Sequence, residues 1–124
     1  MLVSLDRYEV DKKMDDNSKP VTNLLYLGLS SELRTQIQKL LHKGSGFEYF
    51  DDLDDAYSHL ISKNCRTEIV VISDLNDLAP LTVLLKIKKI QRIFSIIVLS
   101  ENKKSSLAIE IIKAGAYDFF LLPV

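Results

Sequence analysis

The segment IVVISDLND, residues 69–77, joins an unbroken apolar run to an acid at the point where the run ends. Four consecutive apolar residues without alternation predict a strand buried on both faces, as in a parallel sheet covered by helices on either side. Polar residues at the carboxyl ends of such strands lie where α/β sheets bind ligands. Asp74 is therefore the first candidate for a functional residue, and the alternative is an acid that caps the following loop.

Composition narrows the function classes. The chain has 124 residues, 47% of them hydrophobic and 27% charged, which suits one soluble domain with a core of its own. A formal net charge of −1 gives no electrostatic reason to expect direct binding of nucleic acid or of a membrane. Cys65 has no second cysteine for a disulfide. Without a signal-like start or a long apolar run, we expect a cytoplasmic protein.

Apolar strands and amphipathic helices alternate outward from the opening segment. Strands are predicted over 23–28, 47–50, 69–72, 95–100 and 117–123, and helices over 31–44, over 51–64, from Pro80 onward and over 103–115. This alternation implies right-handed crossovers and a parallel sheet with helices on both faces. We expect a flavodoxin-like, doubly wound α/β fold with five strands in the order 2-1-3-4-5, whose ligand edge lies between strands one and three.

The two ends of the chain carry separate expectations. Residues 1–21 are predicted to be a flexible lead-in because 11–20 are charged and polar, and residues 22–124 are predicted to form the domain. A fifth helix is absent after the last strand, so we expect strands four and five to leave a bare apolar face. Its cover would be a partner chain, the segment 1–20, or a helix and output domain of a longer protein. We favour a helix and output domain of a longer protein, and we expect this chain, taken alone, to form a homodimer as a consequence.

From Asn23 to Val124 the chain resembles the receiver domain of bacterial two-component response regulators, the CheY-like family. Three segments carry the resemblance: VISDLND (71–77), VLSENKK (98–104) and KAGAYDFFLLPV (113–124). The resemblance puts Asp74 at the phosphoacceptor position, Ser100 at the Thr/Ser that contacts the phosphoryl group, and Phe119 at the switching aromatic. It also implies an output domain in a longer regulator. Without the resemblance, Ser100 reads as a local cap and Phe119 as packing.

The chain departs from the family where the phosphorylation chemistry lies. The family's two acids after strand one, which hold Mg²⁺, correspond to Gly28 and Leu29, and the lysine before the last proline corresponds to Leu122. Phosphoryl transfer needs metal and cation to neutralise charge, and Mg²⁺ needs several oxygen ligands. We therefore expect a degenerate pseudo-receiver with no bound metal or cofactor and no enzymatic activity. It would act by phosphorylation-independent contact with a protein partner or with itself.

Two other interpretations stay open. The first is a working receiver that accepts a phosphoryl group on Asp74 from a histidine kinase, with Mg²⁺ held partly by Glu32 or Asp77. The second is a flavodoxin-like domain that binds a flavin or nucleotide, although the sequence contains no phosphate-cradling glycine loop.

A cluster of acids could suggest a calcium site, but it lacks the spacing of a calcium-binding loop. The cluster instead indicates the solvated start of a helix. Its members are Asp51, Asp52, Asp54 and Asp55.

Overall fold

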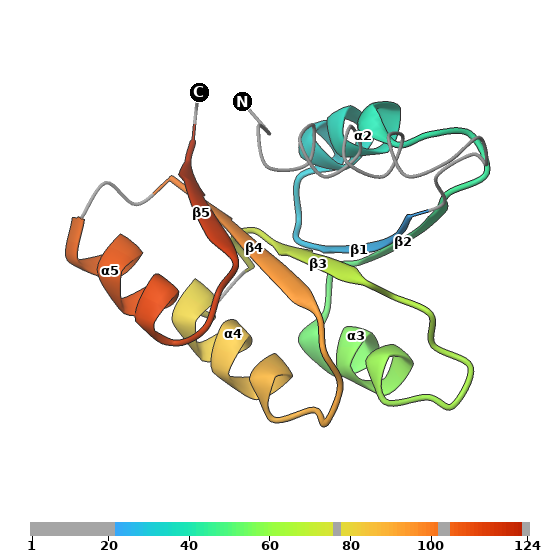
Figure 1. Cartoon of the computed structure of the whole chain (residues 1–124). Coiled ribbons are helices and arrows are strands. Elements are labelled where there is room, and N and C mark those ends of the chain that lie inside the picture. Colours follow the sequence, from blue (N-terminus) through green and yellow to red (C-terminus); the bar gives the residue numbers. More distant parts are fainter. Residues whose placement is uncertain (1–21, 76–77, 102–104, 123–124) are drawn as a thin grey trace, which may run out of the picture.

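The computed structural model describes residues 22–75, 78–101 and 105–122. These residues form a five-stranded parallel sheet in the order β2-β1-β3-β4-β5, which confirms the predicted fold class and strand order (Figure 1). The lead-in expected over 1–21, and Asp77 among the proposed metal ligands, lie outside the described residues.

Strands and helices alternate along the described chain as the sequence pattern predicts. The strands are β1 (Asn23–Leu27), β2 (Gly46–Phe50), β3 (Ile69–Ile72), β4 (Ser95–Ser100) and β5 (Asp118–Leu121). The helices are α2 (Ser31–Leu40), α3 (Leu53–Leu60), α4 (Pro80–Lys88) and α5 (Ser105–Lys113).

The sheet separates two apolar layers. Helices α3, α4 and α5 cover one face, and α2 lies against the other (Figure 1). Alternate side chains of each strand enter the two layers, so β3 sends Val70 and Ile72 toward α3, α4 and α5, and Ile69 and Val71 toward α2. All four side chains are buried, which explains why the strand reads as an unbroken apolar run.

The face of strands four and five for which we expected a cover is buried at the described positions on the α2 side. On the α2 side of the sheet, Ile97 and Leu99 of β4 are 2% and 0% exposed. Leu122, just after β5, is buried in the same apolar cluster as Ile37 of α2. These positions therefore present no open apolar patch that would by itself require a partner.

The helices are shorter than the sequence pattern predicts. The helix expected over 31–44 ends at Leu40, because Leu41 adopts an extended backbone with φ −84° and ψ 145°. Gly44 follows at φ 94°, in the left-handed region that favours glycine. The glycine thus marks the turn beyond the helix and does not mark the end of the helix.

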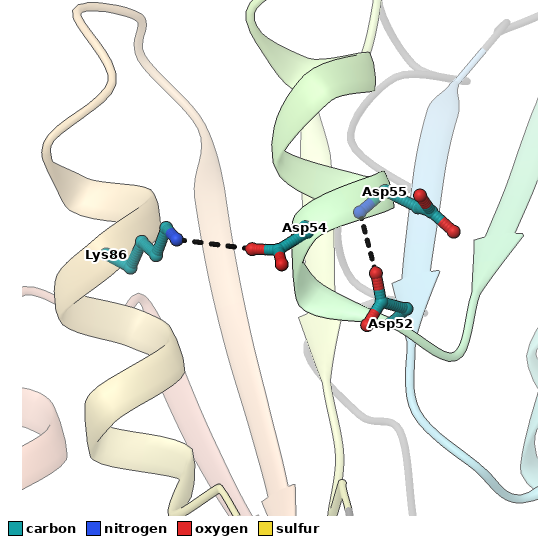
Figure 2. Close-up of polar contacts among 4 residues, drawn as sticks. All are labelled: Asp52, Asp54, Asp55 and Lys86. Atoms are coloured by element: carbon teal, nitrogen blue, oxygen red, sulfur yellow. Dashed lines mark hydrogen bonds and ion pairs between the residues drawn. The ribbon is translucent and has the colours of Figure 1, made fainter.

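The acids before α3 start the helix, as predicted. The Asp52 carboxylate accepts a hydrogen bond from the backbone N–H of Asp55 at 3.1 Å and caps the first turn (Figure 2). Asp54 pairs instead with Lys86 of α4, with 3.4 Å between Oδ1 and Nζ (Figure 2). The side chains of Lys86 and Asp54 are 43% and 84% exposed, so solvent screens the pair and it links α3 to α4 only weakly.

No helix in the described ranges has the length and apolar character needed to cross a membrane.

Candidate functional site

Two of the predicted site residues meet at the carboxyl edge of the sheet. Asp74 follows β3, Ser100 ends β4, and the Ser100 hydroxyl donates to Asp74 Oδ1 across 3.5 Å, at the long limit of a hydrogen bond. Asp74 is exposed, whereas Ser100 is buried. Parallel strands end at the same edge, which is why residues 26 positions apart come together here.

Leu29 and Asp74 follow two neighbouring parallel strands, β1 and β3, at the same edge of the sheet. Leu27 of β1 pairs with Ile72 of β3, and the Ser73 N–H donates to the Leu27 carbonyl at 2.9 Å. Leu29 is 47% exposed, so an alkyl side chain stands at this edge of the sheet where the resemblance calls for a carboxylate.

Leu122 reaches the same edge but contributes no charge to it. Its backbone N–H donates to the Ser100 carbonyl at 2.7 Å, which fixes the chain after β5 against β4. Its side chain is buried in the apolar cluster on the α2 side of the sheet. At the position of the family's lysine, this chain therefore adds to the core.

Phe119 lies in β5 and is half-buried. It pairs with Val98 of β4 and packs against the apolar cluster on the side of α3, α4 and α5. This placement agrees with ordinary packing. The interpretation of Phe119 as a switching aromatic stays a prediction.

A cluster of hydroxyl groups at the edge was not predicted from the sequence. Tyr26 of β1 is 1% exposed, and its phenol lies 2.8 Å from the hydroxyl of Ser73. The backbone N–H of Ser30 also donates to the phenol. Burial raises the pKa of Tyr26 above its ordinary value, so the phenol keeps its proton at neutral pH. A tyrosine inside an apolar strand of a sheet with helices on both faces was the available signal, because a buried phenol needs a partner.

Gly28 is enclosed by this cluster. A Cβ atom at residue 28 would lie 2.6 Å from the Tyr26 hydroxyl oxygen and closer still to the Ser73 hydroxyl. The described glycines with positive φ are Gly44 and Gly115. Gly28 is thus required by space and not by its backbone conformation.

The described residues do not fit a magnesium ion. None of them form a group of three or more acids, histidines or cysteines able to hold a metal. Glu32, an alternative ligand from the sequence, is exposed in the first turn of α2. A single carboxylate with backbone and water makes a poor octahedral site.

A hollow beside the edge opens between the β1–α2 connection and the end of β2. It has a volume of about 160 Å³, and its lining includes Leu29, Arg34 and Tyr49. Arg34 stacks over the ring of Tyr49, 4.1 Å from the ring centre. Cofactor pockets usually measure roughly 300–1,000 Å³. The hollow therefore gives little support to the flavin- or nucleotide-binding interpretation.

No protein-family model matches the sequence, and no curated protein matches it. Solved structures do match. A response regulator receiver domain protein from Clostridium thermocellum aligns at TM-score 0.70 and 22% identity, over 84% of each chain. A response regulator from Burkholderia pseudomallei with a phosphorylated aspartic acid aligns at TM-score 0.68 and 18% identity, over 83% of this chain and 61% of that one.

NtrX from Brucella abortus aligns at TM-score 0.70 and 23% identity, over 85% of this chain but 24% of its own. At these identities the comparisons establish the fold. The chain has the fold of response-regulator receiver domains.

Proposed function

We propose that this chain is a receiver-like regulatory module that signals by protein–protein contact without phosphorylation of Asp74. The observation that carries the proposal is the neighbourhood of Asp74. Leu29 stands exposed after the neighbouring strand, Gly28 leaves no room for an acid, and the side chain of Leu122 is buried in the core.

The size of the expected defect supports this proposal. Removing one positioned electrostatic partner from an active site commonly lowers the rate by roughly 10²–10³-fold. The resemblance calls for two acids and one lysine, and the chain has Gly28, Leu29 and Leu122 in their places. Even partial additivity would make phosphorylation of Asp74 too slow to serve as a signal.

Exposed apolar side chains around α5 and β5 support a role in protein contact. They are Ile109, Ile112, Tyr117 and Leu121, between 42% and 61% exposed. The helix and the strand pack against one another, so these side chains belong to one region of the surface. We propose that the region contacts a second copy of this chain or an output domain of a longer regulator.

The phosphorylation half of the proposal is tested with acetyl phosphate and Mg²⁺. Intact-mass spectrometry of the wild-type chain and of Asp74→Asn should show the same phosphoryl incorporation, at background level. Incorporation that is present in the wild type and lost in Asp74→Asn would contradict the proposal.

The contact half is tested with Ile112→Glu, because a charge there opposes burial of α5 in an interface. Ile93→Glu is the matched control, since Ile93 is 99% exposed after α4. Sedimentation velocity over a concentration series should show self-association of the wild type and of Ile93→Glu, weakened in Ile112→Glu. A wild type that stays monomeric moves the proposed contact to the output domain. Equal association of all three would place the contact elsewhere.

A working receiver that accepts a phosphoryl group from a histidine kinase is the second candidate. The contact between Ser100 and Asp74, with Asp74 open to solvent, favours it. The Burkholderia pseudomallei response regulator of the same fold carries a phosphorylated aspartic acid. The acetyl phosphate experiment separates the two candidates directly.

A further inference from the structure

The hydroxyl cluster around Gly28 connects two parts of the carboxyl edge. The phenol of Tyr26 receives a hydrogen bond from the backbone of Ser30, at the start of α2, and shares a hydrogen bond with Ser73, at the end of β3. Gly28 lies between these groups, and its own N–H donates to the carbonyl of Phe50 at 3.0 Å. Its backbone is thereby held against β2, while the phenol covers its open side.

The phenol has little freedom to move aside. Tyr26 packs within the buried cluster that also contains Leu24, Ile37, Val71 and Leu99. A rigid ring in a close-packed core cannot change rotamer without displacing its neighbours. The Ser73 hydroxyl can rotate, but only by breaking its hydrogen bond with the phenol, and Ser73 is buried.

We propose that the hydroxyl pair of Tyr26 and Ser73 excludes Mg²⁺ from this edge, because the two hydroxyls occupy the space that a side chain at residue 28 would need and the buried phenol holds Ser73 in place. On this view, which rests on the proposed function, restoring acids at residues 28 and 29 does not restore Mg²⁺ binding while Tyr26 is present. The loss of the acid pair and the presence of the phenol form one coupled feature. Tyr26 acts here through sterics and positioning, without touching a ligand itself.

The first test measures steric coupling with a double-mutant cycle. Gly28→Ala adds only the Cβ atom, and we expect it to raise the unfolding equilibrium constant roughly tenfold to a hundredfold in the Tyr26 background. In a Tyr26→Leu background, Gly28→Ala should raise the unfolding equilibrium constant threefold or less, which is roughly the deviation expected between independent sites. Equal costs in the two backgrounds would overturn the inference.

A second pair of variants covers the case in which Tyr26→Leu fails to fold. Ser73→Ala removes the nearer of the two contacts and leaves the tyrosine in the core. Gly28→Ala should be markedly less destabilising in Ser73→Ala than in the wild type. An unchanged cost would show that the cluster does not constrain residue 28.

The second test measures Mg²⁺ binding by isothermal titration calorimetry. The acid-restored variant Gly28→Asp/Leu29→Asp should show no saturable Mg²⁺ binding with Tyr26 present, and saturable binding when Tyr26→Leu is added. Binding of equal strength in both backgrounds would overturn the inference, and so would its absence from both when the chains are folded by circular dichroism.

The same titration of the wild type distinguishes this inference from the proposed function. Saturable Mg²⁺ binding by the wild type refutes the proposed function, whatever the variants do. A wild type that does not bind, together with an acid-restored variant that binds beside Tyr26, refutes only the role of Tyr26.

Discussion

Removing the Tyr26 hydroxyl is the most direct perturbation of the cluster at the carboxyl edge. Tyr26→Phe keeps the buried ring and deletes one oxygen, which leaves the Ser73 hydroxyl and the Ser30 N–H without that partner. Ser73 is only 3% exposed, so water does not readily replace the phenol. A buried polar group left unsatisfied costs about 1–3 kcal/mol, and we expect the free energy of unfolding to fall by that amount.

Urea denaturation followed by circular dichroism measures the loss. With a slope of about 1–3 kcal/mol per molar urea for a small domain, the midpoint should fall by roughly 1 M. Tyr49→Phe is the matched control, because Tyr49 is 56% exposed. Its free energy of unfolding should change by no more than about 0.5 kcal/mol. If the two variants lose the same stability, the buried hydrogen bond has no special weight.

Deleting both partners refines this test. Ser73→Ala alone should also destabilise the domain, because it leaves the Tyr26 phenol with one partner fewer. The double variant Tyr26→Phe/Ser73→Ala should cost less than the sum of the single changes, since no polar group of the pair is left unsatisfied. Strict additivity would contradict a direct interaction between the two hydroxyls.

Three further predictions follow from the fold. Asp52→Ala should lower the free energy of unfolding by about 1 kcal/mol through loss of the α3 cap, whereas Asp54→Ala should cost no more than about 0.5 kcal/mol, and chemical denaturation compares them. Leu84→Ala should lower the free energy of unfolding by about 2–5 kcal/mol because Leu84 is fully buried. Its neighbour Leu85 is 48% exposed, so Leu85→Ala should cause a far smaller loss. Similar losses in the two variants would contradict the assignment of Leu84 to the buried face of α4. Burial raises the folded-state pKa of Tyr26. The contribution of its phenol to the free energy of unfolding is therefore fully present below the unfolded pKa of about 10 and is lost as pH rises through the folded value. Between pH 8 and a pH above 10, the denaturation midpoint should fall more in the wild type than in Tyr26→Phe.

The fold could be predicted because its signals are local. Apolar runs such as 69–72 and helical apolar stripes repeat along the chain, and their alternation admits few topologies. The helix ends could not be predicted as well. The backbone becomes extended at Leu41, before Gly44, and leucine is not a residue that signals the end of a helix.

The site could be predicted in part for the same reason. Asp74 and Ser100 meet because the ends of parallel strands share one edge, which the strand order already implies. The phenol of Tyr26 reaches a serine 47 positions away, and such a contact depends on side-chain geometry that no periodicity shows. Burial of Leu99 depends in the same way on tertiary packing, which the sequence pattern does not show.

The central claim is that the surroundings of Asp74 do not support its phosphorylation. The decisive measurement is a two-dimensional NMR titration of the chain, first with Mg²⁺ and then with beryllofluoride, which mimics the acyl phosphate. We predict no saturable shifts at Asp74, Ser100 or Phe119. Saturable shifts at these residues that disappear in Asp74→Asn would contradict the account and establish a phosphorylated switch.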